Sequence, residues 1–168
     1  MPDPDLTPQW FALRTRSRHE KIVRDRLSGQ GIENLLPTMT RLSQWKDRRK
    51  AIEVPLFSGY CFARFPWNGR LPILKVSGVV EIVGVGSRGE PIPDAEVNAI
   101  KALVESSLAY DAHPYLHEGM TVRVIRGPLE GIQGILLRKA KRFRLVVAVH
   151  LIRQAAAVEL DAADVIPI

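Results

Sequence analysis

The sequence predicts an α+β protein, in which an antiparallel sheet with flanking helices is followed by a small all-β barrel. Three patterns lead to this fold class. Alternating segments rich in aromatic and apolar residues indicate strands near Gln9–Thr15 and Leu56–Phe65. Apolar residues at helical spacing follow Ser17 and Asp94. Beyond residue 118, short β-type segments follow one another at the close spacing of a small barrel.

The first strand, residues 9–15, is expected to lead directly into a helix. That helix is expected to begin at Ser17, because Glu20 three residues later would complete a capping box. Gly29 and Gly31 can end it. Strands are then expected over 32–37, 38–45 and, after a charged hairpin tip at 46–50, over 51–55.

The segment Leu56–Phe65 is the strongest strand candidate. Its period of two places Tyr60, Phe62 and Arg64 on one face, which is therefore unusually aromatic, and Cys61, Ala63 and Phe65 on the other. The remaining elements of this part are expected to be a helix over 71–76, a strand over 79–83, a loop over 84–93 and a long helix from Asp94.

We expect the domains to divide at a linker. Residues 110–117 contain Pro114 and show no periodicity, so they are taken as the linker between a first domain, 1–109, and a second, 118–168. Residues 154–165 are rich in Ala, Leu and Glu, and a helix is an alternative there. The valine-rich residues 145–149 favour the barrel. Its strands are expected over 122–124, 131–137, 145–149, 156–160 and 165–168.

Composition excludes several classes of protein. With 46% apolar and 25% charged residues, the chain can form a core and is expected to be globular. No apolar run approaches the roughly 20 residues that span a bilayer. Residues 1–8 lack the basic and apolar regions of a signal peptide. We therefore expect a cytoplasmic protein that does not bind membranes.

Catalytic and metal-binding chemistry finds little support in the sequence. The single Cys61 allows no intramolecular disulfide, and no His lies near it at ligand spacing. The histidines are scattered, and Pro114 makes a helix that would bring His113 and His117 together improbable. We expect no enzyme activity, no cofactor and no metal.

The positive charge is concentrated in one region. The net charge is +6, and residues 9–50 hold 11 Lys and Arg against 4 Asp and Glu, whereas residues 51–109 hold 5 against 6. Such a region attracts polyanions, nucleic acids above all. On charge alone, a solvated basic face is an equally good interpretation.

The most specific motif lies in the second domain, at residues 119–134. It combines an alternating strand with a tight turn and with glycines that allow the bends of a small barrel. A phosphate-binding loop is the alternative, but no Gly-Lys-Ser/Thr sequence or helical pattern follows the glycines. The residues of the motif are Gly119, Val122, Val124, Gly127, Pro128, Gly131 and Gly134.

This motif resembles the KOW motif, which occurs in SH3-like barrels of transcription and ribosomal proteins. The first domain resembles the N-terminal domain of NusG-type transcription factors in residue type and order, and together the two resemblances cover nearly the whole chain from Gln9. The matching segments are Trp10–Thr15 followed by Glu20 and Lys21, Leu56–Tyr60, Gly78–Val80 and Pro91–Pro93.

The resemblance implies an elongation or antitermination factor that docks on RNA polymerase, at the clamp helices of its largest subunit. An aromatic cluster on a sheet suits the centre of a protein interface. The alternative is that these rings fill the core under the helices. Ser58 stands where the family usually has proline, which makes the turn before Tyr60 less rigid. The expected docking residues are Trp10, Phe57, Tyr60 and Phe62.

The same resemblance places basic residues near upstream or non-template DNA, where phosphate contacts position a protein without reading sequence. Those at the strand-to-helix junction are Arg14, Arg16, Arg18 and His19, and those at the hairpin tip are Lys46, Arg48, Arg49 and Lys50.

In this family the barrel recruits the termination factor Rho or the ribosomal protein NusE, and Phe143 and Ile152 are candidate contacts. We expect a monomer. The alternative function is that of a ribosome- or RNA-binding KOW protein acting outside transcription, through the basic residues of 138–144.

Overall fold

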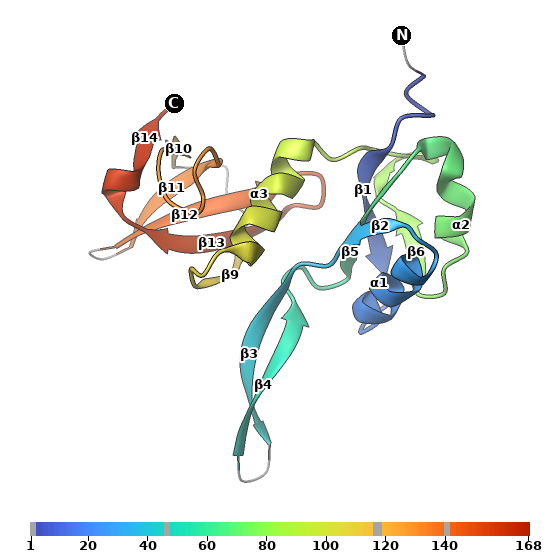
Figure 1. Cartoon of the computed structure of the whole chain (residues 1–168), viewed down its shortest axis with the longest axis horizontal. Helices are drawn as coiled ribbons and strands as arrows, with labels where there is room; N and C mark the ends of the chain where they lie inside the picture. The colour runs from blue at the N-terminus through green and yellow to red at the C-terminus, as the bar shows by residue number, and fades with distance from the viewer. Residues whose placement is uncertain (1–2, 46–47, 116–118, 140–141) are drawn as a thin grey trace. The chain divides into compact units, whose positions relative to one another are not determined.

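The computed structural model of the chain describes residues 3–45, 48–115, 119–139 and 142–168. The chain forms two compact units, and each contains its own antiparallel sheet. The first consists of residues 1–36 and 57–97, and the second of residues 37–56 and 98–168. Figure 1 labels their elements.

A four-stranded antiparallel sheet, in the order β2-β5-β1-β6, forms the centre of the first unit. The central pair is in register from Gln9 opposite Phe65 to Arg14 opposite Tyr60. The predicted strand over 9–15 is confirmed. The strands are β1 (Gln9–Thr15), β2 (Glu33–Leu35), β5 (Tyr60–Phe65) and β6 (Val79–Ile82).

Two helices, α1 (Glu20–Gly29) and α2 (Arg70–Leu74), cover one face of this sheet. Their apolar side chains meet those that alternate inward along β1 and β5, because burying both sets removes them from water. Trp67 joins this core from η1 (Trp67–Gly69). Its buried members include Val23, Leu27, Ile73, Phe11, Leu13, Cys61, Ala63 and Phe65. A short hairpin of β7 (Gly84–Val85) and β8 (Arg88–Gly89) follows β6.

The predicted capping box at Ser17 is wrong. The helix α1 begins at Glu20, and His19 at its N-cap makes no side-chain capping hydrogen bond. Glu20 is instead buried, 6% exposed, and its Oε2 accepts a hydrogen bond from the main-chain N–H of Gly59 at 3.4 Å. Gly59, which is far away in the sequence, therefore binds the carboxylate that the capping box would have used.

The strand predicted over 56–65 is shorter than expected, because β5 begins at Tyr60. A turn precedes it, in which the N–H of Tyr60 donates to the carbonyl of Phe57 at 3.2 Å. Gly59 has a φ of 85° in this turn, a left-handed conformation that glycine adopts without strain. Phe57 therefore lies just before the sheet.

In the second unit, β3 (Thr38–Trp45) and β4 (Arg48–Pro55) form a two-stranded ribbon, visible in Figure 1. It is in register from Thr38 opposite Pro55 to Trp45 opposite Arg48. Residues 48–50, expected at the hairpin tip, therefore belong to a strand, and Lys46 lies outside the described residues. The helix α3 (Asp94–Glu105) begins at the predicted Asp94.

A six-stranded antiparallel sheet, in the order β14-β10-β11-β12-β13-β9, forms the rest of the second unit. The predicted all-β part is thus confirmed, and residues 154–160 are a strand and not the alternative helix. A short η2 (Ala162–Asp164) precedes the last strand. The strands are β9 (Tyr110–His113), β10 (Met120–Val124), β11 (Gln133–Lys139), β12 (Arg142–Val149), β13 (Gln154–Leu160) and β14 (Val165–Pro167).

The first half of the expected linker is a strand of this sheet. β9 pairs with β13, with Tyr110 opposite Val158 and His113 opposite Ala155. Within the same unit, the Tyr110 hydroxyl donates to the main-chain carbonyl of Thr38 at 2.7 Å. Backbone pairing overrides the weak local pattern of these residues, and the division of the chain at 109 and 118 stays a prediction.

Candidate interaction surfaces

The first sheet has two chemically different faces. Residues opposite each other in an antiparallel pair share a face. Trp10, Ala12 and Arg14 of β1 therefore lie with Arg64, Phe62 and Tyr60 of β5, on the face turned away from α1 and α2. Phe57 joins them, because its ring meets that of Phe62 edge-on at 6.3 Å between centroids. We call Trp10, Phe57, Tyr60 and Phe62 the aromatic face.

The structure brings together the four expected docking residues but does not leave them all accessible. Trp10 is 4% exposed, and Phe57 and Phe62 are each 1% exposed, whereas Tyr60 is half-buried. The expectation of exposed rings is therefore wrong for three of the four, because large apolar rings are stabilised by removal from water. The alternative, that these rings fill the core under the helices, agrees with the burial of the three, although the strand alternation turns them away from α1 and α2.

Two cross-strand ion pairs lie on the same face as these rings. Arg14 of β1 pairs with Glu81 of β6, and Arg64 of β5 pairs with Glu33 of β2, both at 3.4 Å. All four side chains are at least 40% exposed, so each pair stabilises the fold only weakly. They add a polar margin to an apolar face, and Glu81 offsets the charge of the predicted DNA contact Arg14.

The turn before Tyr60 is held from two sides. The carbonyl of Gly59 accepts a hydrogen bond from the N–H of Thr15 at 2.8 Å, and its N–H donates to Glu20. These contacts fix the turn even though Ser58 replaces the family's proline. The sequence carried one signal of the role of Glu20, an acidic residue on the side of α1 that faces the sheet.

A shallow depression adjoins this turn and brings basic residues together with Tyr60. Arg14 and Arg18, both predicted DNA contacts, line it beside the edge of the aromatic face. Its lining residues are Arg14, Thr15, Ser17, Arg18, Glu20, Ser58, Gly59 and Tyr60.

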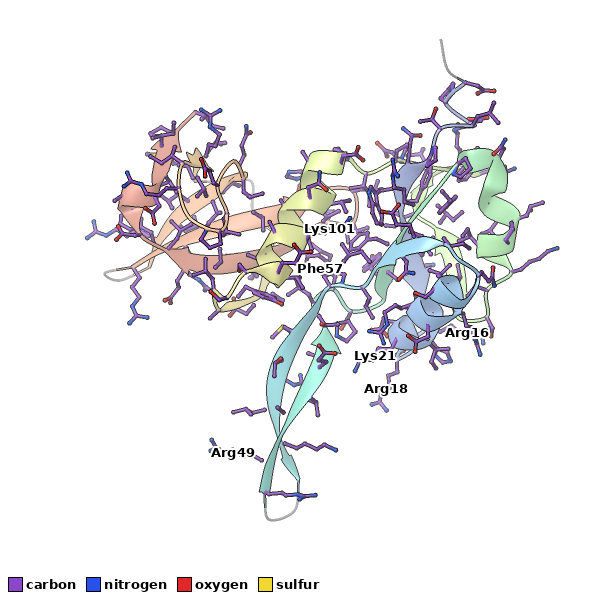
Figure 2. The ribbon with its side chains drawn as sticks, in the orientation of Figure 1. Arg16, Arg18, Lys21, Arg49, Phe57 and Lys101 are labelled. Atoms are coloured by element: carbon purple, nitrogen blue, oxygen red, sulfur yellow. The ribbon has the colours of Figure 1, made fainter. Side chains whose placement is uncertain are left out.

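The junction between β1 and α1 presents cationic side chains on a tight turn. The N–H of His19 donates to the carbonyl of Arg16 at 3.0 Å, and Arg18 adopts a left-handed φ of 61°. Arg16 and Arg18 are exposed and His19 is half-buried, with its Nδ1 2.8 Å from the carbonyl of Ser17. Figure 2 shows Arg16 and Arg18 at the end of the unit that carries α1.

The ribbon of β3 and β4 carries the second set of predicted DNA contacts. Arg48, Arg49 and Lys50 are exposed along β4, where Figure 2 labels Arg49. Because side chains alternate, Arg48 and Lys50 lie on one face of the ribbon and Arg49 on the other. Cations on both faces suit contact with phosphates more than with one flat surface.

The glycine-containing motif forms the turn between β10 and β11. Val122 and Val124 are buried in β10, and the main chain reverses through Gly127 and Gly131, whose φ angles are 92° and 88°. Gly119 precedes β10, Pro128 is exposed in the turn, and Gly134 packs against the backbone of β12. These residues shape the backbone of the turn.

Two candidate contacts of the C-terminal sheet differ in accessibility. Phe143 on β12 is half-buried beside a shallow depression, whereas Ile152 is buried, 6% exposed. The depression is lined by Arg142, Phe143, Glu159, Leu160, Asp161 and Ala162.

Within the described residues, no three His, Cys, Asp or Glu side chains are grouped so as to hold a metal ion. His117 lies outside the described residues. Over the same described ranges, no helix is long and apolar enough to cross a bilayer.

Comparisons with known proteins agree with this architecture. The family model described as "Transcription termination factor nusG" matches residues 8–101, more than half of the chain. The "Transcription termination/antitermination protein NusG" of Borreliella burgdorferi is 27% identical over 181 aligned positions, covering 93% of this chain and 96% of that protein.

A solved structure, described as "Domain interaction in Thermotoga maritima NusG", has the same fold. It superposes with a TM-score of 0.57 at 22% identity and covers 96% of this chain and 97% of that one. The predicted fold class is therefore confirmed, and so is the prediction that the protein is not an enzyme, because the matched family is one of transcription factors. The chain belongs to the NusG family of transcription termination and antitermination factors.

Proposed function

We propose that this chain docks on RNA polymerase through the aromatic face, at the clamp helices of the largest subunit. The observation that carries the proposal is the register of β1 and β5, which sets Tyr60, half-buried and partly open to a partner, on the face opposite α1 and α2 beside the buried Trp10 and Phe62. Aromatic clusters with a polar margin supply most of the binding energy in many protein interfaces. The factor acts as a monomer in the cytoplasm.

Retention on core RNA polymerase tests the docking surface. Tyr60→Ala is the most informative variant, because Tyr60 is half-buried and its loss perturbs the core least. We expect its retention to fall at least about tenfold, as for a contact at the centre of an interface. Val80→Ala on β6 is the matched control, since Val80 is exposed and lies outside the aromatic face. Equal retention of Tyr60→Ala and Val80→Ala would contradict the proposal.

The basic residues supply the second contact, with upstream or non-template DNA. Four of these side chains are exposed, those of Arg16, Arg18, Arg49 and Lys50. A shallow depression is lined by Arg14 and Arg18. Contacts of this kind hold the backbone of DNA through charge and carry no sequence preference. Crosslinking from a photoreactive group at Arg49 to DNA in a polymerase complex tests this step. Crosslinks to polymerase alone would contradict the proposed contact of Arg49 with DNA.

The C-terminal sheet supplies the third contact, the recruitment of Rho or the ribosomal protein NusE. It belongs to the second compact unit and has a buried cluster of its own around Val146, so its surface can bind a separate partner. Phe143 is the better candidate, since Ile152 is buried. Phe143→Ala should weaken capture of Rho or NusE without changing retention on polymerase. Loss of both together would show that the substitution unfolds the chain.

A further inference from the structure

Two arginine side chains of the first unit meet at one tryptophan. The Cζ of Arg70 lies 4.7 Å from the centroid of the Trp67 ring, and the Cζ of Arg88 lies 5.3 Å from it. Trp67 is 7% exposed and contacts the ring of Phe11 in the core, so the indole is a fixed support. Guanidinium groups are attracted to the face of such a ring. The indole therefore concentrates two positive charges at one place.

The N-terminal segment of the chain occupies this place. The Asp5 carboxylate accepts a hydrogen bond from Nη2 of Arg88 and forms an ion pair with it. The main-chain carbonyl of Asp5 accepts a second hydrogen bond, from the N–H of Asn68 at 3.1 Å. The segment is bent by Asp3, whose Oδ1 accepts from the N–H of Asp5 at 2.9 Å. Asp5 is thus bound through both its side chain and its main-chain carbonyl.

The electrostatics of Asp5 agree with this geometry. The hydrogen bond from Arg88 lowers the pKa of the Asp5 carboxyl, and the charges of Arg88 and Arg70 act in the same direction. The pair is still open to water, since the side chains of Arg88 and Asp5 are 56% and 40% exposed. Exposed ion pairs hold their partners weakly. The N-terminal segment can therefore leave the site, whereas the Trp67 ring stays fixed by its packing in the core.

We propose that Trp67, Arg70, Arg88 and the N–H of Asn68 form a binding site for an acidic peptide segment of a partner protein, which residues 3–7 occupy in the free chain. The present occupant defines the ligand class. A carboxylate satisfies the arginines while a main-chain carbonyl reaches Asn68, a combination that a peptide offers and a free phosphate does not. The site uses none of the residues of the aromatic face, and its test does not involve polymerase.

The test measures binding of a fluorescent peptide that copies residues 1–8 to the full chain. Three chains are compared, the wild type, Asp5→Asn, and Asp5→Asn combined with Arg88→Gln. The Asp5→Asn chain should bind the peptide about threefold more tightly than the wild type, because its own segment competes less well once the exposed ion pair is lost. The double variant should lose this gain. Glu130→Gln removes one exposed carboxylate elsewhere and should behave as the wild type.

Three results would overturn the proposal. The Asp5→Asn chain could bind no more tightly than the wild type, which would make the Asp5 contact purely structural. The double variant could bind as tightly as the single one, which would exclude Arg88. Single-stranded DNA or inorganic phosphate could displace the peptide as well as unlabelled peptide does, which would make the site a general anion site. Thermal unfolding of each variant verifies that it is folded.

Discussion

Arg144 on β12 donates from Nη2 to Oδ1 of Asp111 on β9 at 2.6 Å. This pair connects β9, which lies in the segment predicted to be a linker, to another strand of the C-terminal sheet. The Arg144 side chain is only 15% exposed. Its Nε is buried and makes no hydrogen bond to any residue that the structure describes. Asp111 is therefore the main compensation for a mostly buried charge.

Asp111→Ala should destabilise the second unit. Removing the exposed carboxylate of Asp111 leaves the mostly buried guanidinium of Arg144 without its partner, at a cost of about 1–3 kcal/mol in the free energy of unfolding. Urea unfolding of the full chain measures this change. Glu159→Ala is the matched control, because its ion pair with Arg142 is exposed, and it should cost less than about 1 kcal/mol. Equal costs for the two variants would mean that Arg144 does not depend on Asp111.

Cys61 should be inert to thiol reagents while the chain is folded. Burial raises the pKa of its thiol from 9.0 to about 12, so almost none of the reactive thiolate is present at neutral pH. Modification should follow the rate of unfolding, and the chain in urea should react at once. Rapid modification without urea would contradict the burial of Cys61 under α1.

The same pKa shift makes stability depend on pH at the alkaline end. The folded state keeps the thiol proton up to about pH 12, whereas the unfolded state releases it above about pH 9. The contribution of Cys61 to stability is therefore complete below pH 9 and decreases as the pH rises above it. Comparing the pH dependence of unfolding in the wild type and Cys61→Ala isolates this contribution, and identical slopes above pH 9 would exclude it.

Arg18 and Arg16 should respond differently to replacement by glycine. The left-handed φ of 61° at Arg18 costs an ordinary residue roughly 1–2 kcal/mol, a cost that glycine avoids. Arg16 has no such conformation, so Arg16→Gly only loses stability. The free energy of unfolding of Arg18→Gly should exceed that of Arg16→Gly by about 1–2 kcal/mol. The opposite order would contradict the turn geometry.

The affinity for DNA should depend less steeply on salt concentration when one phosphate contact is removed. For Arg49→Gln, the slope of the logarithm of the affinity against the logarithm of the salt concentration should become less negative by about 1. Fluorescence anisotropy with a duplex measures this slope. Lys75→Gln, which removes an exposed cation next to α2, should leave it unchanged. If the two variants change it equally, the effect comes from net charge alone.

Local periodicity predicted much of the fold. The alternation in residues 9–15 and 60–65 defined two strands and the side of the sheet on which each ring lies, and Asp94 was a correct helix start. The errors arose where a distant partner decided the outcome. Glu20 has a hydrogen bond to Gly59 in place of a cap, and Tyr110–His113 pairs with β13, although neither partner is near in the sequence.

The grouping of the rings on one face of the sheet was predictable, but their accessibility was not. The alternation of β5 separated Tyr60 and Phe62 from Cys61, and the structure has the same separation. Which rings are buried depends on packing that a single strand does not encode, so the exposure of Phe57 and Phe62 was wrongly predicted. The contacts of Asp5 with Arg88 and Asn68 join segments far apart in the chain, and no local pattern indicated them.

The pairing of β9 with β13 makes Tyr110–His113, which carries Asp111, the edge of the C-terminal sheet in place of the alanine-rich β13. Without β9, the main-chain N–H and carbonyl groups of β13 next to Ala155, Ala156, Ala157 and Val158 would form an open edge of small, uncharged residues. Such an edge is a template on which a second molecule can add a strand and begin an aggregate. Cleavage by a protease on either side of β9 would expose that edge, so we expect the cleaved chain to aggregate more readily than the intact one.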